Sequence, residues 1–187
     1  SFSVNDNTIL AIDCGTQSLR GILFTPGGQL IERVQIPYAP YVSAEPGWAE
    51  QDPEVYWDSL VKACRALKQA RPQAFSNICG VGVTTLRNTM VNVDASGNPL
   101  RPAMVWMDQR KARPLIGGSG LLNLGLRSFK LGRLLLGIQA GGKCNWIMQN
   151  QADVWKATHK YLQISGFLNY RLTGEYADSS ASQIGHV

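Results

Sequence analysis

Residues 8–20 read Thr8-Ile9-Leu10-Ala11-Ile12-Asp13-Cys14-Gly15-Thr16-Gln17-Ser18-Leu19-Arg20. The apolar run over residues 8–12 predicts a buried strand, and a turn of small and polar residues follows it directly. A second apolar run, residues 19–24, comes straight after this turn, so the two runs predict a β-hairpin. A third run, residues 30–36, follows a Pro-Gly-Gly turn, and the chain is therefore expected to begin with an antiparallel meander of three strands.

The turn of the first hairpin carries groups that suit the phosphates of a nucleotide and their Mg²⁺ ion. Asp13 brings a carboxylate to the end of the strand, Gly15 permits close backbone approach, and Arg20 supplies a cation. Thr16 and Ser18 add hydroxyl donors beside the backbone amides of the turn. A hard oxygen ligand, neutral donors and a nearby cation are what a bound polyphosphate needs. The same residue types also populate ordinary hairpin turns, which is the structural alternative.

Size and composition favour a globular cytoplasmic protein. The 187 residues, 44% of them hydrophobic, can bury the core of one domain or slightly more. No apolar run of about 18 residues and no signal-peptide pattern occurs, so we predict neither a membrane span nor secretion. The four cysteines form no Cys-x-x-Cys pair, and His159 and His186 stand alone, which disfavours a disulfide framework and a zinc site.

The net charge of +5 is concentrated in one part of the chain. Residues 109–152 contain seven Lys or Arg and no acid, whereas the rest has eleven bases against thirteen acids. A local basic stretch suits an enzyme that attracts polyphosphate as well as a nucleic-acid binder. Phe129 and Trp146 are the only aromatic residues in this stretch that could stack on bases, so we predict no nucleic-acid partner.

The following patterns alternate helix and strand, as in an α/β fold. A helix is expected over residues 53–70, with Asp52 as its N-cap. The apolar, glycine-containing run of residues 78–83 predicts a strand that is covered on both faces. Two shorter strands are expected over residues 90–93 and 103–106.

Polar side chains follow two of these strands. Arg87 and Asn88 come after the first strand, and Asp108 follows the second, just past Trp106. Ligands of open α/β sheets gather at such strand ends, so we predict a small-molecule site there. A guanidinium group at the exit of a core strand needs a partner, because burying it unpaired is unfavourable.

The last third of the chain is predicted to be mostly helical. Residues 121–138 have a basic amphipathic pattern, which favours a surface helix over a membrane-surface or partner helix. The basic residues of this pattern are Arg127, Lys130 and Arg133. Further helices are expected from Lys143 onward and over residues 161–172.

One segment nearly matches the phosphate-binding pattern G-x-x-x-x-G-K-[ST]. It reads Gly137-Ile138-Gln139-Ala140-Gly141-Gly142-Lys143-Cys144. The last position of the pattern offers a hydroxyl group to Mg²⁺, and the thiol of Cys144 is a poor substitute. We therefore predict that this segment is not a nucleotide-binding loop.

Several segments, in order along nearly the whole chain, resemble the FGGY family of carbohydrate kinases, which includes glycerol kinase and xylulokinase. The family's first phosphate hairpin resembles residues 13–20, and the loop into its first helix resembles Pro46-Gly47-Trp48-Ala49-Glu50-Gln51-Asp52-Pro53. The Trp-x-Asp-x-Arg segment that lines the family's sugar site is similar to Trp106-Met107-Asp108-Gln109-Arg110. The family's late helix and the loop after it resemble Arg171-Leu172-Thr173-Gly174-Glu175 and residues 178–182.

The resemblance implies a ribonuclease H-like fold, shared with actin and hexokinase, whose mixed sheet carries the antiparallel meander and is flanked by helices. It implies that residues 1–187 form the N-terminal, sugar-binding domain, incomplete at its C-terminal end, and that an ATP-binding domain absent from this chain follows. The implied activity is phosphorylation of a sugar or polyol hydroxyl group with ATP and Mg²⁺. The general base is expected beyond residue 187, so these residues alone are expected to be inactive.

The resemblance also implies roles for the site residues. Asp13 and Arg20 are expected to be catalytic, with Asp13 holding Mg²⁺ through water. The phosphates of ATP are expected on Asp13, Gly15, Thr16, Gln17, Ser18 and Arg20. The acceptor is expected on Arg87, Asn88, Trp106 and Asp108. The structural alternatives are a core tryptophan at Trp106 and a helix cap at Asp108 with Arg110 as its surface partner.

The acceptor and the quaternary structure stay open. Where this chain has Arg87-Asn88, glycerol kinase-like members carry Arg-Glu and xylulokinase-like members carry Met-His, so a polyol and a ketose both fit. Residues 117–142 also look shorter than the family's helical linker. A homodimer is compatible with the sequence. A rival hypothesis is a non-catalytic, actin-like module for nucleotide sensing or assembly, and the presence of Asp13 and Asp108 speaks against it.

Overall fold

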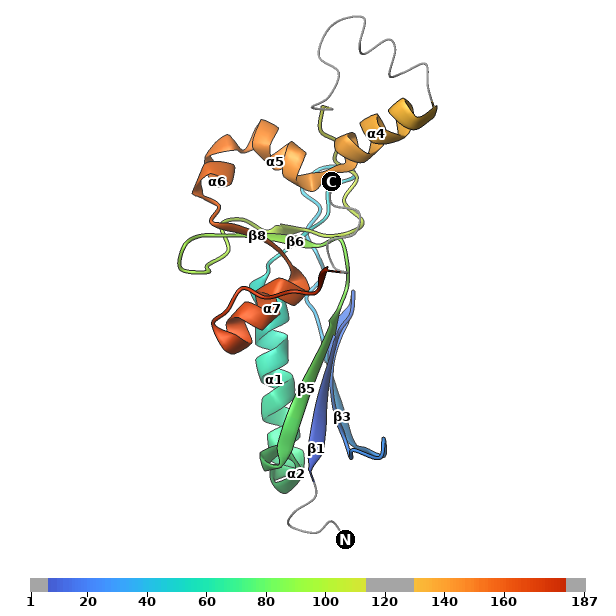
Figure 1. The fold of residues 1–187 in the computed structure, drawn as a ribbon, viewed down its shortest axis with the longest axis vertical. Coiled ribbons are helices and arrows are strands. Elements are labelled where there is room, and N and C mark those ends of the chain that lie inside the picture. The colour runs from blue at the N-terminus through green and yellow to red at the C-terminus, as the bar shows by residue number, and fades with distance from the viewer. Residues whose placement is uncertain (1–6, 114–129, 181–187) are drawn as a thin grey trace, which may run out of the picture.

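The computed structural model describes residues 7–113 and 130–180. Its first sheet contains β1 (Thr8–Cys14), β2 (Ser18–Phe24), β3 (Leu30–Pro37) and β5 (Ile78–Thr85). The strand order is β3-β2-β1-β5; β2 is antiparallel to both β3 and β1, and β1 is parallel to β5 (Figure 1). The predicted meander and the mixed sheet of an α/β fold are therefore confirmed.

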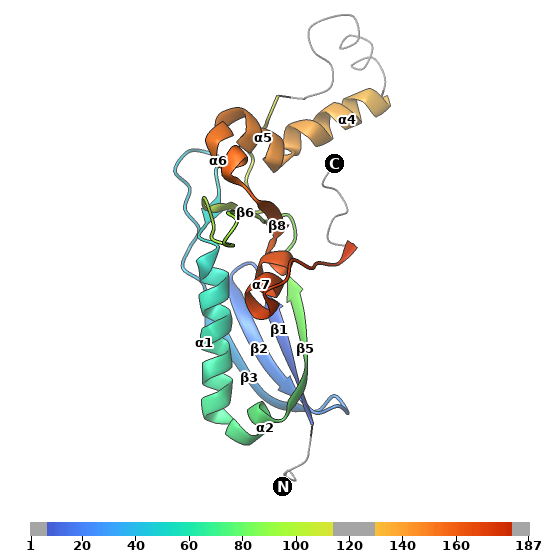
Figure 2. The same cartoon turned by 60° about the vertical axis from the view of Figure 1, so that its left-hand side comes forward.

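One long helix, α1 (Glu54–Ala70), packs on β2 and β3 and covers one face of this sheet (Figure 2). It starts close to the predicted residue, because the carboxylate of Asp52 accepts a hydrogen bond from the backbone N–H of Glu54 at 2.9 Å. Its buried residues recur at three- and four-residue steps: Tyr56, Ser59, Leu60, Ala63 and Leu67. After Arg71, the short α2 (Pro72–Ser76) leads into β5.

A second four-stranded sheet lies beyond the carboxyl end of β5 (Figure 1). Its strands are β4 (Glu50–Gln51), β6 (Met90–Val93), β7 (Ala103–Met104) and β8 (Lys160–Gln163), in the order β4-β7-β6-β8. The predicted helix over residues 161–172 is partly wrong, because β8 extends to Gln163 and α7 (Ile164–Thr173) begins only after it. Pairing with β6, where Val91 lies opposite Leu162, makes β8 a strand. Pairing with a strand that is distant in the sequence cannot be recognised from the pattern of a short apolar run.

Three helices lie beyond the second sheet: α4 (Lys130–Gly141), α5 (Lys143–Asn150) and α6 (Ala152–Ala157). Gly137 and Gly141 lie inside α4 and Lys143 opens α5, so the segment that resembles a nucleotide-binding loop is helical except at Gly142, which joins the two helices. The basic helix predicted over residues 121–138 lies partly outside the described residues, including Arg127, and α4 accounts for its second half. None of the described helices combines the length and the apolar character needed to cross a membrane.

The prediction that residues 78–83 are covered on both faces is wrong. β5 is an edge strand of its sheet, and Val81 leaves 55% of its surface exposed. A Cβ atom placed on Gly80 or Gly82 would meet no atom of the described chain within 4 Å. A continuous apolar run therefore indicates a strand, but the rest of the fold decides whether a further layer covers it.

The turn between β6 and β7 contacts α7 at Gly97, whose φ is +82°. A Cβ atom at this position would lie 2.1 Å from Cε1 of Tyr170. We expect Gly97→Ala to lower the free energy of unfolding by about 2–4 kcal/mol, since it adds left-handed strain and a steric clash. Urea unfolding measures this loss. Gly28→Ala is the matched control, because Gly28 has a φ of +85° but open space around it, and it should lose only about 1–2 kcal/mol. Equal losses would show that the contact with Tyr170 has no effect.

Candidate functional site

The tip of the first hairpin is open to solvent. The N–H of Gly15 donates to the carbonyl of Ser18 at 3.0 Å and closes the turn, while Thr16 and Gln17 at the tip are exposed. A Cβ atom on Gly15 would lie 3.2 Å from that carbonyl, so glycine lets the two strands approach closely. The turn is therefore formed as predicted, with its tip available to a ligand.

Asp13 and Arg20 face each other across the hairpin. They are register partners of β1 and β2, and Nη1 of Arg20 donates to Oδ2 of Asp13 at 2.7 Å. Both side chains keep 39% of their surface exposed. The other carboxylate oxygen, Oδ1, accepts no hydrogen bond from the described residues, so a hydrated cation fits beside it. No group of three His, Cys, Asp or Glu side chains gathers in the part of the chain that the structure describes.

The hydroxyl group of Ser18 lies at the base of the turn rather than at its tip. Ser18 is buried, and its Oγ accepts a hydrogen bond from Nε2 of Gln35 at 3.0 Å. Only its hydroxyl proton is left for a phosphate oxygen. The structure thus separates Ser18, which is tied to the sheet, from Thr16 and Gln17, which project from the tip.

A cavity of about 590 Å³ joins the tip of the hairpin to Trp106. Thr16 and Gln17 belong to its wall, and so do Trp106 and Met107. The wall is completed by Tyr38, Ala39, Pro40, Tyr41, Gln51, Tyr56, Leu86 and Val105. Trp106 leaves 50% of its surface exposed, so the interpretation of Trp106 as a core tryptophan is wrong. A mostly apolar wall with a few polar groups is typical of a small-molecule site.

Arg87 and Asn88 follow β5, the strand parallel to β1. The N–H of Leu86 donates to the carbonyl of Cys14 at 2.8 Å, so the two strand ends lie side by side. Asn88 has a left-handed φ of +56°, and its N–H donates to Oε1 of Gln163 at 3.2 Å. Arg87 is exposed, so the cost of burying an unpaired guanidinium group does not arise at this position. The cavity wall includes Leu86 but neither of the two polar residues after it.

The side chain of Asp108 is almost completely buried, with 1% of its surface exposed. Arg110 donates from Nε to Oδ1 at 2.9 Å and from Nη2 to Oδ2 at 2.6 Å, and the N–H of Ala49 donates to Oδ2 at 2.8 Å. Burial by itself raises the pKa of the Asp108 carboxyl group, but the hydrogen bonds from Arg110 and Ala49 outweigh burial, and the pKa is lowered. Both oxygens of Asp108 are engaged, and Asp108 does not line the cavity. Arg110, which is also buried, is not a surface partner.

These two residues belong to a buried ion cluster, which we call the Arg110 cluster: Glu50, Arg101, Asp108 and Arg110. Glu50 accepts hydrogen bonds from both Arg101 and Arg110. The guanidinium carbon of Arg110 lies 4.1 Å from the ring centroid of Trp48 and 4.6 Å from that of Trp146. The cluster ties the loop before α1 to the segment after β7. Glu50 lies in the family-like segment of residues 46–53, but neither its ion pairs nor those of Arg101 could be predicted, because ion pairs between distant segments produce no local periodicity.

The cysteine next to Asp13 is not a nucleophile. Cys14 is fully buried, and its Sγ lies 3.3 Å from the hydroxyl group of Tyr38. Burial raises the pKa of the Cys14 thiol to about 11, so the thiol stays protonated at neutral pH. The site therefore offers charge and positioning rather than a thiolate for covalent catalysis.

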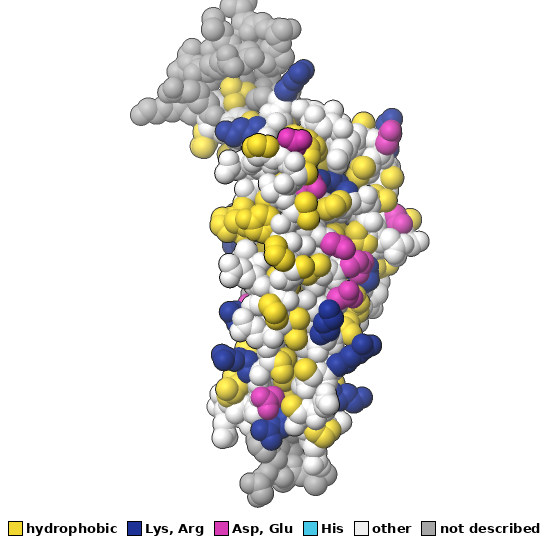
Figure 3. Space-filling view, turned by 180° about the vertical axis from the view of Figure 1, so that it is seen from behind, with side chains coloured by type: hydrophobic (Ala, Val, Ile, Leu, Met, Phe, Trp, Pro, Cys, Tyr) yellow, Lys and Arg dark blue, Asp and Glu magenta, His cyan; other side chains and the backbone are white. Residues whose placement is uncertain are grey.

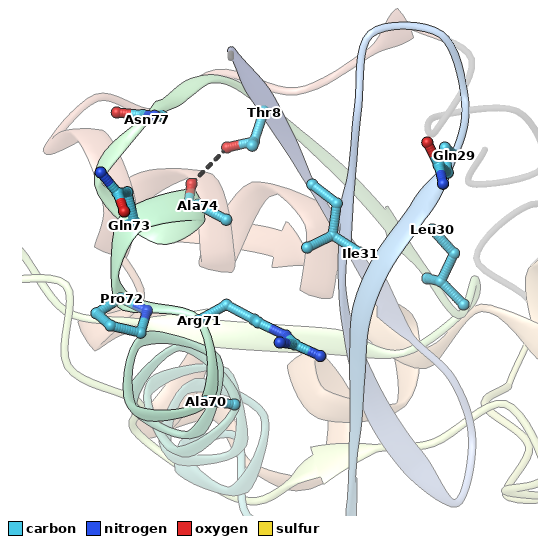
Figure 4. Close-up of a pocket in the computed structure, with 10 residues that line it drawn as sticks. All are labelled: Thr8, Gln29, Leu30, Ile31, Ala70, Arg71, Pro72, Gln73, Ala74 and Asn77. Atoms are coloured by element: carbon cyan, nitrogen blue, oxygen red, sulfur yellow. Dashed lines mark hydrogen bonds between the residues drawn. The ribbon is translucent and has the colours of Figure 1, made fainter. Parts of the chain in front are cut away.

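A second cavity, of about 380 Å³, lies at the opposite end of β1 (Figure 4). It is lined by Thr8, Gln29, Leu30, Ile31, Ala70, Arg71, Pro72, Gln73, Ala74 and Asn77. The length of β1 separates it from the hairpin tip by about 20 Å. The guanidinium group of Arg71 is paired with Glu32 at 3.2 Å, and no predicted site residue lines this cavity. The cavity at the hairpin tip is therefore the candidate functional site.

Charges of both signs are mixed on the face of the molecule that Figure 3 shows. Lys and Arg side chains are interspersed there with Asp and Glu and with apolar side chains. Arg110 and Lys143, both from the basic stretch of residues 109–152, are buried and add no charge to the surface. Part of the local basicity of the sequence is thus internal.

Comparison with known proteins places the chain among carbohydrate kinases. The model of the N-terminal domain of the FGGY family of carbohydrate kinases matches residues 8–186. A glycerol kinase from Ectopseudomonas mendocina is 32% identical over 171 residues, which are 89% of this chain and 34% of that protein. The structure of a xylulose kinase from Rhodospirillum rubrum matches with a TM-score of 0.77 and 24% identity, over 96% of this chain and 37% of that one. A glycerol kinase from Plasmodium falciparum, solved with ADP, matches with a TM-score of 0.69 and 20% identity, over 90% and 35% of the two chains.

These likenesses cover nearly all of the chain but only part of each relative. The chain spans about a third of the length of the curated relatives it matches. The structural matches confirm the predicted ribonuclease H-like fold of actin and hexokinase. Because the family model extends over residues 8–186, the chain belongs to the FGGY family of carbohydrate kinases.

Proposed function

We propose that the full-length protein that carries this chain transfers the γ-phosphoryl group of ATP to a hydroxyl group of a sugar or polyol. The observation that supports this most directly is that the tip of the phosphate hairpin and Trp106 line one cavity. A phosphate donor and a small acceptor can meet there within reach of the same side chains. Membership of a carbohydrate kinase family supports the reaction class.

Asp13 and Arg20 supply the charges of the proposed reaction. Asp13 would hold Mg²⁺ through water, since Arg20 engages only one of its two carboxylate oxygens. Bound Mg²⁺ offsets the negative charge of the phosphates. Arg20 orients the carboxylate and stabilises charge on the moving phosphoryl group. Neutral donors come from Thr16, Gln17 and the hydroxyl proton of Ser18, and Gly15 allows the phosphates to approach the backbone.

The acceptor is proposed to lie against Trp106. The exposed face of this ring suits the C–H groups of a sugar or polyol, which pack on aromatic side chains. Arg87 and Asn88, next in sequence to the cavity-lining Leu86, are proposed to bind its hydroxyl groups. Asp108 acts indirectly in this scheme, because its carboxylate holds the segment after β7 through the Arg110 cluster.

The rest of the machinery is proposed to belong to a second domain of the full-length protein. That domain would bind most of the ATP and, together with residues beyond 187, provide the base that takes the proton from the attacking hydroxyl group. The 187 residues alone are then inactive. A cytoplasmic location is proposed because all four cysteines are unpaired, as expected in a reducing compartment.

ADP formation by the full-length protein, measured with Mg²⁺-ATP and a panel of polyols and ketoses, tests the proposal. We expect turnover with at least one acceptor, and its loss when a chelator removes Mg²⁺. Tight ATP binding without ADP formation for any acceptor would reject the kinase and favour the nucleotide-sensing module. Sugar phosphate made by the 187 residues alone would show that the general base lies within them.

Trp106→Ala should weaken the binding of the acceptor much more than that of ATP. We expect the acceptor KM to rise about tenfold or more, since covering an aromatic face contributes about 1.5–3 kcal/mol, while the ATP KM changes little. Initial rates with each substrate varied in turn measure both constants. Trp155→Ala, on α6 and away from the cavity wall, is the control and should leave both constants nearly unchanged. Equal increases in the two constants for Trp106→Ala would reject the acceptor assignment.

A further inference from the structure

We propose that Lys143 is a positioning residue of the acceptor site, whose ammonium group holds the Arg87-Asn88 loop against the segment that carries Trp106. This inference rests on the proposed function, because it assigns a role within the same site. Lys143 opens α5 and comes from the segment that resembles a nucleotide-binding loop.

The partners of Lys143 are all backbone carbonyl groups. Nζ donates to the carbonyl of Asn88, to that of Val105 at 2.8 Å and to that of Met104 at 3.3 Å. The residue leaves only 9% of its surface exposed. Three N–H donors meet three carbonyl groups, so the ammonium group is fully used and is not available to a phosphate.

The carbonyl groups belong to the two segments that carry the proposed acceptor-binding side chains. Asn88 directly follows Arg87, and Val105 directly precedes Trp106. Asn88 has a φ of +56°, in the left-handed region, which asparagine enters more readily than most residues other than glycine. Its carbonyl group is held by Lys143 and its N–H by Gln163. The lysine thus fixes both the conformation of the loop and its distance from the Trp106 segment.

Two hydrogen bonds fix the junction of α4 and α5 and thereby the position of Lys143. The carbonyl of Ala140, at the end of α4, accepts a hydrogen bond from the N–H of Ala112 at 2.8 Å. The amide Nδ2 of Asn145 donates to the carbonyl of Gln139 at 2.9 Å, across the junction of the two helices. The junction therefore directs Lys143 toward the β6–β7 side of the site, where its three acceptors lie.

The charge of Lys143 is sensitive to pH. Burial lowers its pKa to about 8, while nearby Asp108 acts to raise the pKa and Arg110 to lower it. No ion pair joins Lys143 to a carboxylate among the residues that the structure describes. Above this pKa the neutral amine has two N–H groups for three carbonyl groups, so one of the three links is lost.

Deprotonation of Lys143 should weaken the binding of the acceptor, whereas its contribution to the free energy of unfolding changes in the favourable direction. In the unfolded chain the pKa of the lysine returns to 10.5, so between about 8 and 10.5 the unfolded state binds more protons than the folded state. The contribution of this group to the free energy of unfolding therefore rises with pH in that window. A loss of acceptor affinity over the same window is then a local effect and not the onset of unfolding.

Steady-state kinetics of the full-length protein test the role of Lys143. For the wild type we expect the acceptor KM to rise severalfold from about pH 7 to about pH 9.5, with a constant ATP KM and no fall in Tm. Lys143→Met should raise the acceptor KM about tenfold at neutral pH, leave the ATP KM within about twofold, and remove the pH dependence. Lys111→Met is the matched control, because Lys111 is exposed on the segment after β7, and it should behave as the wild type does.

Two results would overturn the proposal. One is an acceptor KM of the wild type that does not change up to about pH 9.5, which decides the question even where Lys143→Met fails to fold. The other is an equal rise of both KM values in a folded Lys143→Met variant. Absence of turnover by the wild type with every acceptor would instead overturn the proposed function, and the role of Lys143 with it.

Discussion

Asp13→Asn should reduce the turnover number of the full-length protein by about a thousandfold or more. The substitution keeps the size of the side chain and an oxygen that can accept from Arg20, but it removes the charge that we propose to hold Mg²⁺ through water. The effect should fall mainly on kcat, because the metal offsets charge that shifts during phosphoryl transfer. Coupled measurement of ADP formation at saturating ATP and acceptor gives this value.

Two further measurements separate this effect from damage to the fold. Glu32→Gln is the matched control, since Glu32 lies on the same sheet but pairs with Arg71 at 3.2 Å, and it should keep turnover within about twofold. In a thermal-shift assay Asp13→Asn should lose the response to Mg²⁺-ATP and keep the stabilisation by the acceptor. The opposite pattern would exchange the two subsites and contradict our assignment of the hairpin.

Arg110→Met should lower the free energy of unfolding by about 3–5 kcal/mol, because it leaves a buried carboxylate without its partner. Only 3% of the Arg110 side chain and 1% of the Asp108 side chain are exposed. Glu50 still keeps Arg101 as a partner, whereas Asp108 loses its two-point contact with the guanidinium group. Urea unfolding measures the loss. Arg113→Met, an exposed arginine of the same segment, should change stability by less than about 0.5 kcal/mol.

Asp108→Asn decides between two roles for that residue. If Asp108 holds the loop, as its buried contacts with Arg110 and Ala49 indicate, the variant should lose stability together with activity. A selective rise of the acceptor KM at unchanged stability would show that Asp108 contacts the acceptor directly. The sequence resemblance alone favours direct contact, and the geometry favours the indirect role.

Local sequence patterns are sufficient to predict the helices and strands whose stabilising contacts lie close together in the sequence. The β1–β2 hairpin, α1 with its Asp52 cap, and β6 form at or near the predicted residues. In each of them the periodicity, the turn residues and the capping residue indicate the same structure. β8 differs, because its partner is β6 and only that pairing makes a strand of residues that also suit a helix.

In the candidate site, too, some features follow from local sequence and others depend on the tertiary structure. The open turn with Asp13, Gly15 and Arg20 follows from residue types that permit only a tight, polar hairpin between two apolar runs. The exposure of Trp106, by contrast, depends on which segments surround it, and sequence patterns suit a core tryptophan equally well. Arg87 is similar, since its exposure follows from the edge position of β5.

The sequence by itself determined that residues 8–24 form a tight, polar hairpin in an α/β fold and that the chain resembles FGGY carbohydrate kinases. Tertiary structure alone decided that Asp108 is locked in the Arg110 cluster, that Trp106 shares a cavity with the hairpin tip, and that Lys143 is saturated by carbonyl groups. The physical reason is how far apart in the sequence the interacting residues lie. Turns, caps and periodicity act between neighbours in the chain, whereas burial and ion pairing depend on segments that meet only after folding.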